Sequence, residues 1–205
     1  MPQRRIATEP RWRPIDQTTN YQLPAALRCW LLDEGSLTGR LIQLQQGAFA
    51  VRRLYQGWRV PLFSERLLLA QKPRQQAIIR EVLLTLDDRP VVFARSVFPM
   101  ASMGGDLGHL RRLENKSLGA ILFKHPGMHR SPFEIAHIAG DSDYLPPPLH
   151  QEKPAWARRC LFEIQGKSLL VSEVFLEQFT PWAAPLPLHR TQRGVVSAAI
   201  VPATQ

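Results

Sequence analysis

The fold is decided by Ala77-Ile-Ile-Arg-Glu-Val-Leu-Leu-Thr-Leu86, the segment Asp87-Asp-Arg-Pro90 and Val91-Val-Phe-Ala-Arg-Ser-Val-Phe98. The first and last segments are apolar and rich in β-branched residues, whereas aspartate and proline between them are typical of turns. The pattern therefore predicts a β-hairpin with strands at 77–86 and 91–98 and a turn at 87–90. Pro99 ends the second strand because proline lacks the N–H that a strand ladder needs.

A second hairpin is predicted toward the end of the chain. Its strands are Trp156–Ile164 and Ser168–Leu176, and Gln165-Gly166-Lys167 forms the turn. Strands that come in adjacent pairs with short turns favour an antiparallel sheet, so we expect a single α+β domain. The other predicted elements are helices at 24–34, 36–46, 106–114 and 118–123, and strands at 49–60 and 133–138.

The elements predict one domain at residues 21–182. Residues 1–20 carry little apolar pattern and are expected to form a flexible N-terminal arm. The segment 183–205 holds no acidic residue and no clear period, and is expected to form a C-terminal tail. The length of 205 residues fits a single domain, which is typically about 100–200 residues long.

The chain is strongly basic, with 26 lysines and arginines, of which 21 are arginines, against 17 acidic residues. Such a balance attracts anions: nucleic acid, an anionic membrane surface or acidic metabolites. The arginines are spread along the chain, and no basic run or nucleic-acid-reading motif occurs. Arginine also binds carboxylates in a fork geometry, so charge alone leaves these partner classes open.

Targeting signals and cofactor motifs are not evident in the sequence. No apolar run approaches the roughly 20 residues that a transmembrane helix needs, and no secretory h-region follows Met1, so we expect a cytoplasmic protein. Cys29 and Cys160 are expected to be reduced core residues. The histidine spacing does not suggest a metal site, and glycine-rich nucleotide motifs and serine-hydrolase motifs are lacking, so no cofactor is predicted.

Two ionisable residues stand among apolar neighbours on the predicted strands. Side chains alternate across a strand with period two, so Arg80 shares a face with Ile78 and Val82. Glu173 is likewise next to Val171 on its own face. Removing a single ion from water costs several kcal/mol even after relaxation, so each of these charges needs a partner.

Two interpretations of this pair remain open at this point. Arg80 and Glu173 form a structural salt bridge with each other, or they face opposite ends of one anionic ligand. An arginine holds a carboxylate by two parallel hydrogen bonds, and a carboxylate in an apolar pocket can accept a hydroxyl hydrogen or carry a proton. Arg95 is a further candidate cation for such a ligand, unless it lies at an exposed or edge position.

Six further segments are informative because of their order and their spacing along the chain. They are Trp30-Leu-Leu-Asp-Glu-Gly-Ser-Leu-Thr38, Ile79-Arg-Glu-Val-Leu-Leu84, Ala94-Arg-Ser-Val-Phe-Pro99, Leu118-Gly-Ala-Ile-Leu-Phe123, Trp156-Ala-Arg-Arg159 and Leu169-Leu-Val-Ser-Glu-Val-Phe-Leu176. Taken together, they resemble the chorismate lyase family over about residues 24–178. The resemblance implies a sheet of about six antiparallel strands, with helices and helix-turn-helix lids over an internal ligand cavity.

The resemblance also implies an activity and a set of site residues. The family eliminates pyruvate from chorismate to give 4-hydroxybenzoate for ubiquinone biosynthesis, without metal or organic cofactor. By this resemblance, Arg80 binds the ring carboxylate and Glu173 meets the ring hydroxyl. Leu37 and Leu118 match positions that offer main-chain N–H groups to the carboxylate, although the family's best-known version has methionine at position 37. We assign Arg95 to the departing enolpyruvyl carboxylate.

The expected partners are therefore the substrate chorismate and the product 4-hydroxybenzoate, bound by a monomer without nucleic acid. A different class remains as the alternative: a non-enzymatic sensor domain that binds a small acid. The same fold resembles effector domains of some bacterial repressors, which carry a winged DNA-binding domain in front, whereas only about 20 residues precede the core here. A basic nucleic-acid binder is a third hypothesis, and salt-sensitive retention on DNA would favour it.

Overall fold

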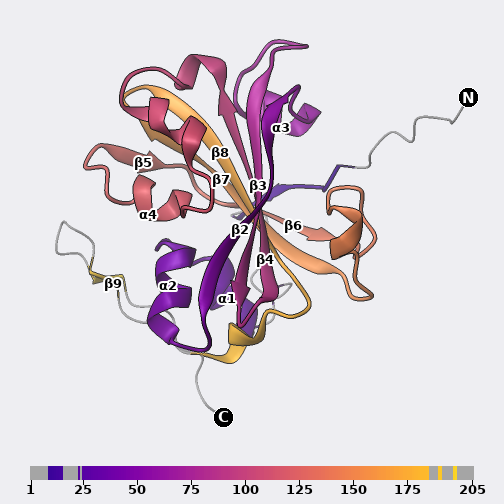
Figure 1. Ribbon diagram of the computed structural model, residues 1–205. Coiled ribbons are helices and arrows are strands. Elements are labelled where there is room, and N and C mark those ends of the chain that lie inside the picture. The colour runs from indigo at the N-terminus through magenta and orange to yellow at the C-terminus, as the bar shows by residue number, and fades with distance from the viewer. Residues whose placement is uncertain (1–8, 16–22, 24, 185–188, 191–195, 198–205) are drawn as a thin grey trace, which may run out of the picture.

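The structure is a computed structural model that describes residues 9–15, 23, 25–184, 189–190 and 196–197 (Figure 1). Its centre is an eight-stranded sheet in the order β1-β6-β7-β8-β4-β3-β2, with β5 paired beside β7, and every pairing is antiparallel. The strands are β1 (Arg13–Pro14), β2 (Phe49–Arg59), β3 (Ala77–Leu86), β4 (Arg89–Pro99), β5 (Met128–Arg130), β6 (Glu134–Ile138), β7 (Ala155–Ile164) and β8 (Lys167–Phe175).

Short helices complete the fold. They are α1 (Ala25–Leu31), α2 (Leu37–Leu44), α3 (Phe63–Leu68) and α4 (Leu118–Leu122), with 3₁₀ turns η3 (Met100–Ser102), η4 (Gly105–Arg112), η5 (Pro147–Leu149) and η6 (Thr180–Ala183). A separate two-stranded pair joins β9 (His189–Arg190) to β10 (Val196–Ser197). Among the described residues, no helix is long and apolar enough to cross a membrane.

Both predicted hairpins are confirmed, and both close with two-residue turns. Asp87 and Asp88 have φ values of 47° and 61°, and Gln165 and Gly166 have φ values of 51° and 72°. Positive φ at both central residues is the mark of a type I′ turn, whose twist matches that of the flanking strands. The first turn is therefore shorter than the segment 87–90 predicted for it, because β4 already begins at Arg89.

The remaining predicted elements are present with shifted bounds. The α+β fold with an antiparallel sheet is confirmed; the predicted six strands correspond to β2, β3, β4, β6, β7 and β8, and the short β1 and β5 are additions. The predicted helix at 106–114 is instead the 3₁₀ segment η4, because Gly104, Gly105 and Gly108 weaken an α-helix there. Most of the predicted arm (1–20) and tail (183–205) lies outside the described residues, although β1 pairs with β6.

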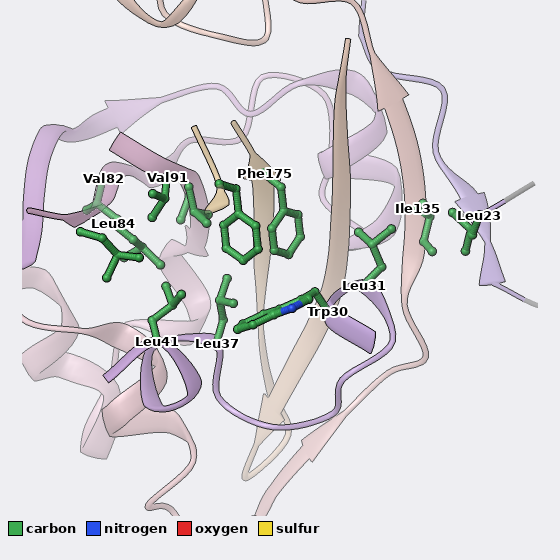
Figure 2. Close-up of a cluster of buried hydrophobic side chains, with 14 residues drawn as sticks. Leu23, Trp30, Leu31, Leu37, Leu41, Val82, Leu84, Val91, Ile135 and Phe175 are labelled. Atoms are coloured by element: carbon green, nitrogen blue, oxygen red, sulfur yellow. The ribbon is translucent and has the colours of Figure 1, made fainter. Parts of the chain in front are cut away.

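The helices divide between the two faces of the sheet. A core cluster packs Trp30 of α1 and Leu41 of α2 against Val82, Leu84 and Phe175 of the sheet (Figure 2). Each such large apolar side chain contributes about 1.5–3 kcal/mol when it is fully buried. This cluster therefore fixes the α1–α2 pair over one face of the sheet.

The opposite face is covered by α3 and by residues 144–149 around η5. Leu68 and Leu69, at the end of α3, pack against Ile79 of β3 and Val97 of β4. Ile79 and Val97 lie directly opposite each other in the β3–β4 ladder and therefore point to the same face. Different segments therefore pack on the two faces of the sheet. Because side chains alternate along a strand, neighbouring residues of β3 or β4 contact different segments.

Candidate functional site

A pocket lies between the sheet and the starts of α2 and α4. Its empty volume is about 640 Å³, which includes the open space at its mouth. Four residues predicted for the site line it: Leu37, Arg80, Leu118 and Glu173. The rest of the wall is largely apolar and includes Val82, Leu84, Phe133, Phe162 and Val171.

Arg80 is a buried cation of this pocket, with 2 % of its surface exposed. Its Nη2 donates to the main-chain carbonyls of Glu114 at 3.0 Å and Lys116 at 2.7 Å, which fix the guanidinium in place. Its Nε is buried and has no hydrogen-bond partner among the described residues. Burial, together with the charge of Arg53, lowers the pKa of Arg80 to about 10. An anion bound there would satisfy the free donor and offset the buried charge.

Glu173 is held by a neighbour on the adjacent strand. Nε of Arg158 donates to Glu173 Oε2 at 2.6 Å, and the two residues lie directly opposite each other on β7 and β8. Arg158 also donates from Nη1 to the carbonyls of Trp30 at 2.6 Å and Asp33 at 2.9 Å. One arginine thus joins the Glu173 carboxylate to the segment that connects α1 with α2.

Arg80 and Glu173 do not pair with each other. Arg80 lies opposite Ser96, and Glu173 lies opposite Ala94, so the two residues point to one face from strands that flank β4. With strands about 4.8 Å apart and about 3.4 Å of rise per residue, this register separates their Cα atoms by about 12 Å. That leaves room for a ring between the two side chains, so the structure does not support the salt-bridge interpretation.

The starts of α2 and α4 meet at the edge of the pocket. Ser36 caps α2 by accepting from the N–H of Gly39, and Ser117 caps α4 by accepting from the N–H of Ala120. The Ser117 hydroxyl in turn donates to Thr38 Oγ1 at 3.0 Å. This bond ties together the two helix starts at Leu37 and Leu118, which are the positions predicted to offer main-chain N–H groups.

Arg95 does not belong to this site, so its assignment to the departing carboxylate is wrong. It lies opposite Glu81 on β3, one residue out of phase with the row of Arg80, and points to the face covered by α3. There its Nε and Nη2 donate to Glu65 at 2.7 and 3.1 Å, and its Nη1 donates to Glu81. The cation that was expected at the ligand is therefore fully engaged on the other side of the sheet.

Glu65→Gln is expected to lower the free energy of unfolding by about 3 kcal/mol, because breaking a buried ion pair leaves an uncompensated charge. Glu65 is 1 % exposed, and Arg95 would keep only Glu81 as a counter-ion. Urea-induced unfolding followed by circular dichroism measures the change. Glu177→Gln is the matched control, since its partner Lys153 has 76 % of its side chain exposed and such pairs contribute about 0–1 kcal/mol. Equal decreases in the free energy of unfolding of the two variants would contradict the structural role of the ion pairs that Arg95 forms with Glu65 and Glu81.

Two further cavity arginines were missed by the sequence reasoning. Arg158 shares its face of β7 with apolar residues, so the parity argument applied to Glu173 was available for it too. Arg130 lies on the three-residue strand β5, which is too short to show a period. Both line the pocket. Among the described residues, no group of three or more His, Cys, Asp or Glu side chains is placed to hold a metal ion.

The predicted core cysteines take different positions. Cys160 is buried, lines the pocket and has its pKa raised by burial to about 12, so its thiol is unreactive at neutral pH. Cys29 is half-buried and packs against the α1–α2 core cluster. Both are free thiols.

The amino-acid sequence matches a known protein family. The model of the family described as Chorismate lyase matches residues 7–182. A protein of Azoarcus sp. (strain BH72) named probable chorismate pyruvate-lyase is 43 % identical over 164 residues, covering 73 % of this chain and 83 % of that protein. A protein of the same name from Idiomarina loihiensis is 36 % identical over 182 residues, covering 85 % and 89 %.

Among solved structures, the effector domain of PhnF from Mycobacterium smegmatis has a TM-score of 0.50 at 14 % identity, covering 71 % of this chain and 91 % of that one. At this identity the likeness shows a shared fold alone. The family match and the relatives, by contrast, span most of the chain. The protein therefore belongs to the chorismate lyase family.

Proposed function

We propose that this protein eliminates pyruvate from chorismate and releases 4-hydroxybenzoate. The observation that supports this most strongly is the pair Arg80 and Glu173, which line one pocket from different strands without pairing with each other. A ligand with a carboxylate at one end and a hydroxyl at the other, para across a ring, fits between them. Relatives of this chain are named probable chorismate pyruvate-lyase, and chorismate has its ring carboxylate and hydroxyl in this arrangement.

The reaction does not require a covalent bond between the substrate and the protein. The C–H electron pair at the ring carbon that bears the hydroxyl becomes a ring π bond, and the neighbouring C–O pair leaves with the enolpyruvyl oxygen. The ring becomes aromatic, and the released proton ends on the methylene carbon of the leaving group, which gives pyruvate. No oxidant or reductant is needed. The protein must therefore hold the reactive conformer, neutralise charge and exclude water.

The roles of the side chains follow from their surroundings. Arg80 anchors the ring carboxylate through its free Nε, assisted by the main-chain N–H groups of Leu37 and Leu118. Glu173 accepts a hydrogen bond from the ring hydroxyl and relays the proton released from the same ring carbon to the methylene carbon of the leaving group, using the carboxylate oxygen that Arg158 leaves free. Arg158 is a positioning residue, because it holds the carboxylate of Glu173 and the α1–α2 connection in one arrangement.

The decisive assay for this function is the release of pyruvate from chorismate, followed with a coupled lactate dehydrogenase. The wild-type protein should consume chorismate and form pyruvate and 4-hydroxybenzoate in equal amounts, in buffer containing a metal chelator. Binding of 4-hydroxybenzoate without any turnover of chorismate would instead make the protein a sensor of the same fold. Retention on DNA that weakens with salt, with no response to chorismate, would favour a nucleic-acid binder.

The product is expected to enter ubiquinone biosynthesis in the cytoplasm. We propose that the protein acts as a monomer. A bacterial strain that lacks its own chorismate lyase should regain ubiquinone when it carries this chain. Activity in vitro without such rescue would separate the chemistry from this biological role.

A further inference from the structure

The pocket carries an excess of positive charge. Three arginines line it, Arg80, Arg130 and Arg158, and the one acidic residue among the lining side chains is Glu173. Arg158 is paired with Glu173, so their charges compensate each other. Within the described part of the chain, neither Arg80 nor Arg130 has a carboxylate within ion-pair distance. The pocket therefore holds two cations that form no ion pair with a described residue.

This pattern is not general in the molecule. Three buried arginines outside this pocket each pair with a carboxylate: Arg40 with Asp33 at 2.8 Å, Arg95 with Glu65 at 2.7 Å and Arg159 with Glu134 at 2.6 Å. A buried charge without a counter-ion costs free energy, and such groups in proteins are normally paired. Arg80 is buried and Arg130 half-buried, and neither has a carboxylate partner among the described residues, so the pocket suits a ligand that brings two separate negative charges.

Arg130 is positioned by aromatic contacts instead of by ion pairs. Its guanidinium lies over the ring of Phe133, with Cζ 4.4 Å from the ring centroid, and 6.0 Å from that of Phe123. Such contacts orient a cation without consuming its hydrogen-bond donors. On β5 it lies directly opposite Phe162, another residue of the pocket wall. Its donors are therefore available to a ligand.

Arg130 lies at the Glu173 end of the pocket. The guanidinium groups of Arg130 and Arg158 both lie over the ring of Phe133, with Cζ 4.4 and 4.6 Å from its centroid, and Arg158 is paired with Glu173. In chorismate, the enolpyruvyl ether is attached to the ring carbon next to the one that bears the hydroxyl. A ligand that places its hydroxyl at Glu173 therefore directs its side-chain carboxylate into the region of Arg130.

We propose that Arg130 binds the carboxylate of the enolpyruvyl side chain, and so selects the dianionic substrate over the monoanionic product. The inference rests on the proposed function and extends it to the leaving group. Arg80 serves the carboxylate that substrate and product share, whereas Arg130 serves the one that departs with pyruvate. As the C–O pair moves onto the enolpyruvyl oxygen, the same cation is close to the developing charge.

The test compares substrate kinetics with product binding in Arg130→Gln. We expect kcat/KM for chorismate to fall at least tenfold, whereas the Kd of 4-hydroxybenzoate, measured by calorimetry, should change by less than about threefold. Arg130→Lys should recover part of kcat/KM because it keeps the charge but loses the planar fork. Arg112→Gln is the matched control, since Arg112 is exposed and should leave both quantities unchanged. Wild-type kinetics in Arg130→Gln, or equal losses of substrate and product affinity, would overturn the proposal.

The wild-type protein supplies an independent measurement that needs no variant to fold. The probe is 4-hydroxybenzoate with a carboxymethoxy group on the ring carbon next to the hydroxyl. This dianion should bind at least tenfold more tightly than its methoxy counterpart, and Arg130→Gln should abolish that preference. Equal affinities in the wild-type protein would contradict the role of Arg130. If the wild-type protein turns over chorismate but binds the two probes equally, only the role of Arg130 is contradicted. If it does not turn over chorismate at all, the proposed function is contradicted.

Discussion

Glu173→Gln is expected to lower kcat for chorismate at least 100-fold while the protein stays folded. The amide has nearly the same shape as the carboxylate, and its oxygen can still accept the hydrogen bond that Arg158 now donates to Oε2. Arg158 also keeps the carbonyls of Trp30 and Asp33 as acceptors. An amide cannot take up a proton, however, and a positioned general base contributes about 10²–10⁴ in rate. Pyruvate release measures kcat, and circular dichroism and thermal unfolding report the fold.

A nearby glutamate gives the matched control for this variant. Glu163 is exposed near the end of β7, so Glu163→Gln removes the same charge from the neighbouring strand without touching the pocket. It should retain the wild-type rate. If purified Glu173→Gln also turned over chorismate at the wild-type rate, Glu173 would have no part in the chemistry.

Arg80→Ala is expected to weaken the binding of 4-hydroxybenzoate about 100-fold or more. A hydrogen bond to a charged group contributes about 1.5–3 kcal/mol, and the loss of the guanidinium also leaves the ligand carboxylate without its counter-charge in a buried site. Since the substrate and product share this carboxylate, kcat/KM for chorismate should fall by a similar factor. Isothermal titration calorimetry with 4-hydroxybenzoate measures the first effect, and the pyruvate assay measures the second.

The structural part of this loss can be separated from the binding part. Arg80 also satisfies the carbonyls of Glu114 and Lys116, so Arg80→Ala should lower the stability of the free protein as well. Arg80→Lys keeps a cation and should bind the ligand more weakly than wild type but more tightly than Arg80→Ala. Arg52→Ala is the control, because Arg52 is exposed on the other face of the sheet, opposite Leu83. Unchanged 4-hydroxybenzoate affinity in both Arg80 variants would exclude Arg80 from the site.

The sequence was sufficient for the elements that local patterns determine. Apolar β-branched runs with turn residues between them predicted both hairpins, and two-residue alternation placed Arg80 and Glu173 on apolar faces. The alternation could not decide whether the two charges meet each other, because that depends on how the hairpins pair across β4 and β8. Long-range register of this kind is not written in either hairpin alone.

Arg95 shows how one residue of register reverses a functional assignment. A turn at 87–90 would set Leu86 opposite Val91 and would place Arg95 on the same face as Arg80. In the structure, Leu86 pairs with Arg89, and a bulge then leaves Val91 unpaired between the partners of Thr85 and Leu84. A bulge adds one residue to one strand and so changes the face of every residue beyond it. Nothing in the local sequence predicted that bulge.

The residues that contact the charged side chains could not be predicted from the sequence either. Arg95 is neutralised by Glu65, thirty residues earlier in the chain and on a helix that no sequence pattern predicted. Arg130 owes its orientation to the rings of Phe133 and Phe123, which become neighbours only when β5 and α4 pack together. Charge balance within a pocket is a property of the folded chain, so it became visible only in three dimensions.

The most direct test of the account is a crystal structure of the protein with 4-hydroxybenzoate. We expect the ring in the pocket between the sheet and the starts of α2 and α4. Its carboxylate should lie within hydrogen-bond distance of the Arg80 guanidinium, and its hydroxyl should lie within the same distance of the Glu173 carboxylate. A product molecule bound elsewhere, or one turned end for end so that its carboxylate avoids Arg80, would contradict the account.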